Sequence, residues 1–169
     1  MTARSRGFTL LEIMITITIV AILSTMGIIA YGKAQSIARD AIRKQDLKNM
    51  KLSLELYYQR NGNFPSTTDG SGWDLSTKGG TWISGLDSTY TNKLPTDVKQ
   101  TSSCKSPPAS SCYLYGYFST AWEGGTPGKG YILTAKLENA DDKDAGNTVT
   151  YQDTTAVWRE PGYYTLTEK

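Results

Sequence analysis

The sequence predicts an α+β fold in which one long N-terminal helix packs on a small antiparallel sheet. Of the 24 residues from Phe8 to Tyr31, 17 are apolar. All six prolines lie at Pro65 or later, together with 13 of the 16 glycines. Because proline and glycine interrupt regular elements, an unbroken helix should precede a loop-rich head at 62–169.

The apolar first part of this helix, at 8–32, has the length of a membrane span. Glu12 is its one charge, and an uncharged run follows from Ile13 to Gly32. At about 1.5 Å per residue this run covers roughly 30 Å, the thickness of a bilayer's hydrocarbon core. A cleaved signal peptide and a plain single-span anchor are alternative interpretations. We expect this apolar half to protrude from the head.

The second part of the helix, at 33–61, is amphipathic. Its apolar stripe recurs at three- and four-residue steps and consists of Leu47, Met50, Leu54, Tyr57 and Tyr58. Asn61 and Gly62 then provide a C-terminal capping signal. This half should therefore pack on the head.

Basic residues dominate this amphipathic segment. It carries seven Lys or Arg between Lys33 and Arg60 against three acids, a net charge of +4. Nucleic-acid binding is one interpretation. We favour a solvated helix face with subunit contacts, because no aromatic residue is interleaved with the basic ones before Tyr57.

The head contains the strands of the predicted sheet, at about 112–167. Alternating patterns predict strands at 112–119 and 129–139. Shorter strands are expected at 149–151, 156–158 and 163–167. The preceding segment, 66–111, is interpreted as a loop region with short elements.

The composition excludes several kinds of catalytic and metal site. The chain has no histidine, which rules out Ser-His-Asp and Cys-His triads and HExxH zinc sites. Two cysteines cannot supply a Cys₄ zinc cluster. The formal charge of +2 favours no charged partner by itself. We therefore expect the protein not to be an enzyme.

The N-terminal motif carries a family resemblance. Residues 4–12 read RSRGFTLLE, a short basic leader followed by Gly7, Phe8 and a glutamate at position 12 that opens the apolar helix. This string resembles the prepilin processing signal of the type IV filament superfamily, which includes type IV pilins and the pseudopilins of type II secretion.

The resemblance implies a sequence of processing and assembly steps. A prepilin peptidase would remove leader 1–7 by cutting after Gly7, and Phe8 would be N-methylated. The chain would be a single-pass membrane protein with its head outside the cytoplasm. An inner-membrane assembly platform would then build copies into a helical filament, extracellular or periplasmic. There Glu12 would meet the amine of a neighbour's Phe8, since a charge within a membrane needs a partner.

Two further strings resemble one branch of this superfamily. Residues 57–65, a Tyr-rich helix end followed by Phe64-Pro65, and the Leu-Pro-x-Asp step at 94–97 resemble G-type pseudopilins. The longer segment 66–111 and the cysteine pair are more pilin-like. A structural subunit of a type IV pilus-like filament is the function we expect. The alternatives are a G-type pseudopilin of type II secretion and a membrane-anchored extracytoplasmic binding domain.

Two local features complete the predictions. Cys104 and Cys112 should form a disulfide, because an extracytoplasmic compartment permits one. Oxygen ligands suited to calcium cluster late in the chain at Glu138, Asn139, Asp141, Asp142 and Asp144. Pseudopilin heads that this head resembles hold calcium in a late loop. Lys143 breaks the EF-hand spacing, so we favour a polar hairpin loop and expect no other cofactor.

Overall fold

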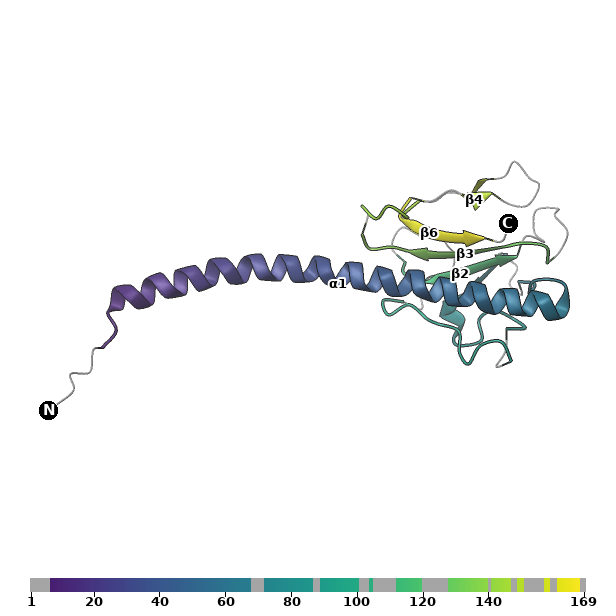
Figure 1. Ribbon diagram of the computed structural model, residues 1–169, viewed down its shortest axis with the longest axis horizontal. Helices are drawn as coiled ribbons and strands as arrows, with labels where there is room; N and C mark the ends of the chain where they lie inside the picture. The colour runs from purple at the N-terminus through teal and green to yellow at the C-terminus, as the bar shows by residue number, and fades with distance from the viewer. Residues whose placement is uncertain are drawn as a thin grey trace. The chain divides into compact units, whose positions relative to one another are not determined.

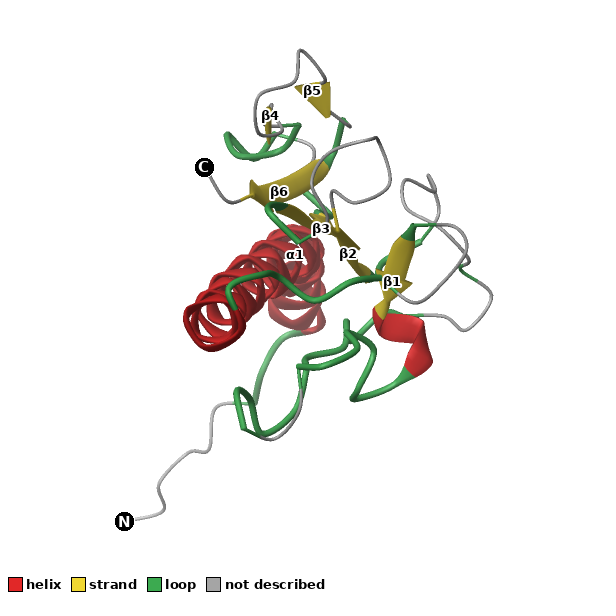
Figure 2. Cartoon of the chain, turned by 90° about the vertical axis from the view of Figure 1, so that its right-hand side faces the viewer, coloured by secondary structure: helices red, strands yellow, loops and turns green. Residues whose placement is uncertain are grey.

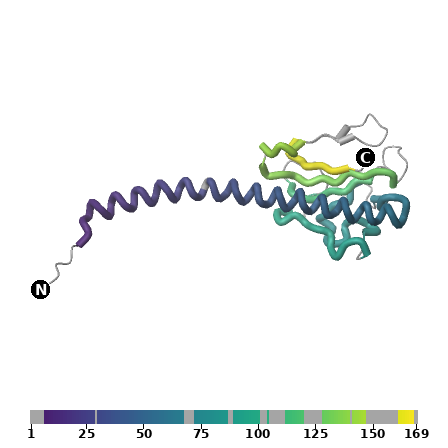
Figure 3. Tube along the Cα trace, viewed as in Figure 1, coloured from purple at the N-terminus to yellow at the C-terminus, as the bar shows by residue number. Residues whose placement is uncertain are grey.

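The computed structural model consists of two compact units, Met1–Ala38 and Arg39–Lys169. It describes residues 7–67, 72–86, 89–100, 104, 112–119, 128–139, 141–146, 149–150, 157–158 and 161–167. One helix, α1 (Leu10–Asn61), includes residues of both units and follows an unbroken path in Figures 1 and 3. The single long helix predicted from the missing prolines is confirmed.

The second unit contains a four-stranded antiparallel sheet. Its strand order is β1 (Trp73–Leu75), β2 (Tyr115–Ser119), β3 (Tyr131–Lys136) and β6 (Tyr163–Thr167). Figure 2 shows β1 at one edge of this sheet and the helix lying across one face. A separate two-stranded ladder pairs β4 (Val149–Thr150) with β5 (Val157–Trp158). The predicted α+β arrangement is confirmed.

Strand β1 is one of the short elements expected within 66–111, but it extends the sheet beyond the predicted range of about 112–167. Its three residues, Trp-Asp-Leu, are too few to show an alternating pattern. They form a strand because they pair with β2, where Asp74 lies opposite Tyr117. A short 3₁₀ turn, η1 (Ser76–Lys78), follows at once. The predicted strand starts were also too early, since β2 begins at Tyr115 and β3 at Tyr131.

The main core lies between the sheet and the second half of α1. From the helix, the predicted stripe residues Leu47, Met50 and Leu54 are at most 2% exposed. From the sheet, alternate residues of two strands complete this core, namely Tyr115, Tyr117, Tyr131, Leu133 and Ala135. The period of two therefore assigns one face of the sheet to the helix.

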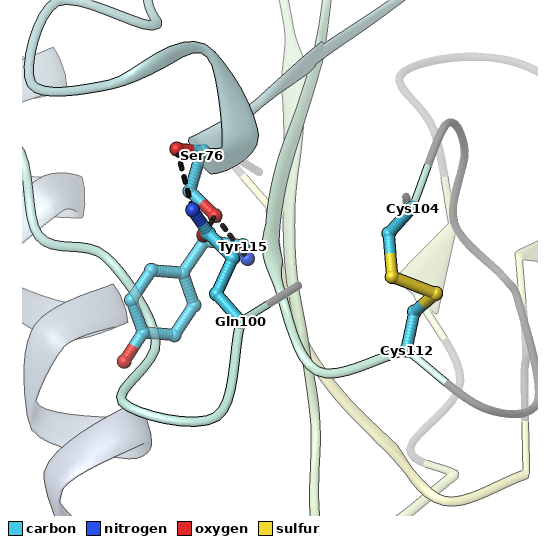
Figure 4. The surroundings of a disulfide bond; sticks show 5 residues. All are labelled: Ser76, Gln100, Cys104, Cys112 and Tyr115. Carbon is cyan, nitrogen blue, oxygen red and sulfur yellow. Dashed lines mark hydrogen bonds between the residues drawn. A yellow bond between two sulfur atoms is a disulfide. The ribbon is translucent and has the colours of Figure 1, made fainter. Parts of the chain in front are cut away.

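A smaller cluster contains the disulfide. Cys104 and Cys112 are bonded, with their Cα atoms 5.9 Å apart, and they pack with Leu75 and Leu114. Figure 4 shows this bond, and in the same view Ser76 bridges Gln100 and the backbone N–H of Tyr115. The bond therefore ties residue 104 to the start of the central strand β2.

The helix ends as the capping signal predicted. Gly62 adopts a left-handed φ of 71° and donates its N–H to the carbonyl oxygen of Tyr58 at 2.8 Å. The chain then passes Gly128, where an added Cβ would lie 2.7 Å from the Cβ of Asn63. The Phe64 ring packs edge to face against the Tyr131 ring, with ring centroids 4.8 Å apart. This exit fixes the helix end against the sheet.

Candidate functional site

The predicted processing residues lie at the start of α1. Thr9 caps the helix: its backbone N–H and its hydroxyl both donate to Glu12 Oε2, at 2.8 and 2.9 Å. In return, the backbone N–H of Glu12 donates to Thr9 Oγ1 at 3.2 Å. This reciprocal pattern is a capping box. Glu12 Oε1 takes no part in it and retains its acceptor capacity.

The apolar segment that follows is exposed to solvent. Leu10, Val20 and Met26 are 77%, 60% and 66% exposed, and the isoleucines between them are at least half exposed. By length and composition, α1 is able to cross a membrane. Burying such a continuous apolar surface in lipid or in protein is strongly favourable. The isolated chain therefore presents a surface that requires a partner.

A second cluster of functional groups lies in the other unit, around Arg43. Its guanidinium forms a bidentate ion pair with Asp97: Nε donates to Oδ2 at 2.5 Å and Nη2 donates to Oδ1 at 3.0 Å. Nη1 donates to Asp40 Oδ1 at 2.7 Å and to Glu138 Oε1 at 2.8 Å. Three carboxylates from three parts of the chain thus share one cation.

Two further cations complete this group, which we call the Arg43 cluster: Arg39, Asp40, Arg43, Asp97, Lys99 and Glu138. Arg39 donates from Nε and Nη2 to the two carboxylate oxygens of Glu138, each at 2.7 Å. Lys99 Nζ donates to Glu138 Oε2 at 2.6 Å. The cluster holds three positive and three negative groups, so its formal charges cancel.

Burial and pairing act together on the pKa values of this cluster. Burial disfavours the charge of Arg43, but hydrogen bonds to Asp97, Glu138 and Asp40 outweigh it and raise the pKa of this guanidinium. Hydrogen bonds from Arg39 lower the pKa of Glu138 well below its usual range. Burial opposes this shift, and Lys99 and Arg43 add to it. Both groups therefore stay ionised across the neutral pH range.

Asp40 fixes the late loop to the helix. Its carboxylate accepts the backbone N–H of Glu138 at 2.9 and 3.1 Å and that of Asn139 at 2.8 Å. One helical turn on, Lys44 Nζ donates to Asp142 Oδ1 at 2.5 Å and to Asp144 Oδ2 at 2.7 Å. These bonds satisfy backbone groups at 138–139 and neutralise part of the acidic loop.

The predicted calcium ligands therefore already have other partners. Glu138 binds three cations, Asn139 binds the helix through its backbone, and Asp142 and Asp144 share Lys44. Asp141 is exposed and donates its N–H to Asn139 Oδ1 at 3.4 Å. Among the described residues, no group of three or more acidic or cysteine side chains is placed to hold a metal ion. Calcium binding stays a prediction, and it would require displacement of Lys44.

Three of the seven basic helix residues are not part of the solvated face that we expected, whereas Lys33, Lys48 and Arg60 are exposed. Arg39, Arg43 and Lys44 pair with carboxylates of the same chain's head. Lys51 pairs with Glu55, and Arg60 lies 5.8 Å from the centre of the Tyr90 ring. The basic helix and the acidic loop therefore meet within one subunit. Because carboxylates of the head neutralise these three cations, fewer positive charges on the helix are free to bind a nucleic acid.

Sequence reasoning did not identify Arg43 and Asp97 as partners. Asp97 entered only through the resemblance of 94–97, and Arg43 was counted among solvated charges. One signal could have located Arg43. It precedes Leu47 by four residues and Leu54 by eleven, which places it on the apolar stripe of the helix. A charge on that stripe must be paired.

The comparison with known proteins identifies the N-terminal element. Residues 2–28 match the family model of the prokaryotic N-terminal methylation motif. No curated protein and no solved structure shows significant similarity to the chain. The chain therefore carries the type IV prepilin-like signal motif at the start of a pilin-like α+β arrangement.

The motif indicates how the chain is processed. The motif indicates a type IV pilin-like or pseudopilin substrate of prepilin peptidase. It implies processing by that peptidase and assembly into a filament. Together with the exposed apolar helix, it fits a membrane-anchored precursor.

Proposed function

We propose that the protein is a structural subunit of a type IV pilus-like filament. The observation that carries this proposal is the methylation motif at 2–28, which opens directly into an exposed apolar helix. Cleavage after Gly7 makes Phe8 the new N-terminus and removes Arg4 and Arg6. Removing seven residues from 169 leaves 162, whose formal charge is zero.

The exposed helix supports the assembly role. Before assembly, the bilayer covers the apolar residues from Leu10 to Tyr31. After a subunit leaves the membrane, only other apolar helices can cover them equally well. The Glu12 carboxylate would then form an ion pair with the N-terminal amine of a neighbour's Phe8. Its Oε1 is a suitable acceptor, because the capping box with Thr9 occupies Oε2 and not Oε1.

The disulfide favours a pilus over a secretion pseudopilin. Cys104 and Cys112 are bonded and buried in the head, at 3% and 9% exposure. Within the resemblance, this pair and the long segment 66–111 are the pilin-like features. The bond itself fits any head outside the cytoplasm, because the periplasm and the cell exterior are both oxidising.

Mass spectrometry of the mature chain tests the processing step. We expect an N-terminus at Phe8 carrying one added methyl group. Gly7→Asp should leave the leader attached, whereas Gly27→Ala should be cut normally, because nothing lies within 4 Å of an added Cβ there. A mature start at Met1 or near Lys33 would overturn the proposal.

Electron microscopy of sheared filaments tests the pilus assignment. We expect long external fibres whose subunit is this chain, identified by peptide mass mapping. If a correctly processed chain remains wholly within the cell envelope, the protein would instead be a pseudopilin.

A further inference from the structure

A small surface pit lies beside the Arg43 cluster, between α1 and the segment 96–98. It is lined from the helix by Ile42 and Asp46, and from the head by Thr96, Val98 and Tyr115. Side chains of the Arg43 cluster form its remaining walls. The pit has a volume of about 20 Å³. A cavity of this volume holds one group of about the size of a water molecule.

Within the part of the chain that the structure describes, Asp46 is the carboxylate of this pit at which no cation is directed. Tyr115 Oη donates to Asp46 Oδ2 at 2.7 Å. Figure 4 shows the Tyr115 ring directed toward the ribbon of the helix. The two guanidinium groups beside the pit donate to carboxylates of their own cluster, whose formal charges cancel. The pit therefore has one negative charge in excess, and Asp46 Oδ1 keeps its acceptor capacity.

Burial penalises the charge of this carboxylate. Burial raises the pKa of Asp46, the hydrogen bond from Tyr115 opposes this shift, and the charge of Asp97 adds to it. A cation placed against Oδ1 would relieve the penalty, because a nearby opposite charge favours the ionised form. The pit is therefore suited to a positively charged group.

The first unit of the chain provides the complementary charge. After removal of the leader, residues 8–38 contain two charged side chains, Glu12 and Lys33. In the proposed filament, Glu12 pairs with the amine of a neighbour's Phe8. Lys33 is exposed and directly follows the uncharged run that ends at Gly32. When neighbouring subunits cover this run, the Lys33 ammonium loses water and requires a carboxylate.

We propose that Lys33 of one copy inserts its ammonium into the pit of a second copy and forms an ion pair with Asp46 there. The proposal rests on the filament function proposed above and names one charge pair between its subunits.

The pit fits a lysine side chain in size and in polarity. A lysine ammonium is a compact group comparable to a water molecule, whereas the guanidinium of arginine is a wider planar fork. Ile42 and Val98 at the rim are 54% and 74% exposed, so the aliphatic stem of a lysine can pack on them. The pair therefore covers two exposed apolar side chains together with the open carboxylate oxygen.

Zero-length cross-linking of filaments tests the pair directly. A carbodiimide activates a carboxylate, and an amine in contact with it then forms an amide and releases the reagent as a urea. Sheared filaments of the full chain are treated in this way, separated on a denaturing gel and mapped by mass spectrometry. We expect dimers and larger species that contain a peptide joining Lys33 to Asp46.

Two matched substitutions separate this pair from general effects of charge. Lys33→Gln removes the proposed cation, and Lys48→Gln removes another exposed lysine of the same helix. Lys33→Gln should abolish the cross-linked peptide and lower the fibre yield several-fold, with normal leader cleavage and melting temperature. Lys48→Gln should change neither the peptide nor the yield. Equal fibre yields from the two variants would overturn the proposal.

Asp46→Asn tests the other partner of the pair. Asparagine keeps an oxygen that accepts the Tyr115 hydroxyl, so the head should remain folded while the fibre yield falls as in Lys33→Gln. The double variant should lose no more than either single variant, because both changes remove the same interaction. Additive losses would show that the two residues act separately.

The cross-linking result also distinguishes this pair from the filament function. Fibres of the unaltered chain without the joined peptide, or with Asp46 joined to another lysine, would overturn the pair and leave the filament function standing. Failure of the unaltered chain to form any fibre would overturn both proposals.

Discussion

Arg43 and Asp97 form a two-pronged ion pair across 54 positions of sequence, and their side chains are only 2% and 1% exposed. The pair joins the helix to the segment before the disulfide. The same buried guanidinium also pairs with Asp40 and Glu138, so it connects three segments of the chain.

Removing the central cation should destabilise the head strongly. Arg43→Met leaves three carboxylates without their shared partner, and breaking a buried pair in this way costs about 3–5 kcal/mol. Urea unfolding of the processed protein in detergent measures the loss. Lys51→Met is the control, since it removes a half-exposed pair worth less than about 1 kcal/mol. A similar loss in both variants would contradict the role of burial.

Acid should weaken the head through Glu138. Its folded pKa is lowered from an ordinary value near 4.5, so the folded state binds fewer protons than the unfolded chain below that pH. The stability from this group is therefore complete above pH 4.5 and is lost as pH falls toward the folded pKa. The slope is about 1.4 kcal/mol per pH unit for one proton.

Unfolding free energies measured between pH 7 and pH 2 test this assignment. Glu138→Gln should be less stable at neutral pH and should show a shallower acid slope. Glu55→Gln, at a half-exposed helix position, should keep the slope of the unaltered protein. An unchanged slope in Glu138→Gln would assign the acid sensitivity to other carboxylates.

The same change should destabilise the head at one of two nearby leucines and have almost no effect at the other. Leu54 is fully buried against the sheet, so Leu54→Asp should cost at least about 3 kcal/mol of stability. Leu52 is exposed, and Leu52→Asp should change stability by no more than about 0.5 kcal/mol. Thermal melting followed by circular dichroism compares them. Equal melting temperatures would contradict the packing of α1 on the sheet.

Glu12 has two roles that one pair of variants can separate. Glu12→Gln keeps a side chain able to complete the capping box with Thr9 but removes its charge. Glu12→Ala removes both. If the neighbour's amine requires a carboxylate, both variants should be cleaved and folded normally, yet neither should form fibres. Full fibre yield from Glu12→Gln would leave capping as the function of this residue.

The disulfide should contribute measurably to stability. Closing a loop of this length contributes about 2–3 kcal/mol in the chain-entropy model. Paired Cys104→Ser and Cys112→Ser changes should therefore lower the melting temperature, and dithiothreitol should lower that of the unaltered protein to a similar value. An insensitive protein would show that the surrounding cluster with Leu75 and Leu114 suffices.

The helix and its apolar stripe were predictable because they depend on local periodicity. Proline-free sequence, spacing of Leu47, Met50 and Leu54, and the capping glycine all lie within one continuous segment. Strand β1 was not predictable, since three residues carry no period and owe their conformation to pairing with β2.

The partners of the charged residues could not be predicted from the sequence for a different reason. The basic helix segment, with its net charge of +4, is visible in the composition, but composition does not say whether its charges meet acids within a chain or between chains. That choice depends on the fold, which brings positions 40–44, 97 and 138–144 together. Only the placement of Arg43 on an otherwise apolar stripe indicated an internal partner in advance.

The cancellation of charge inside the Arg43 cluster matters most in a repetitive polymer. Any unpaired charge on one copy recurs on every copy, so its repulsion accumulates with length. Six ionised groups that neutralise one another within each copy add nothing to this sum. Growth of the polymer then depends little on the surrounding ionic strength as far as these groups are concerned.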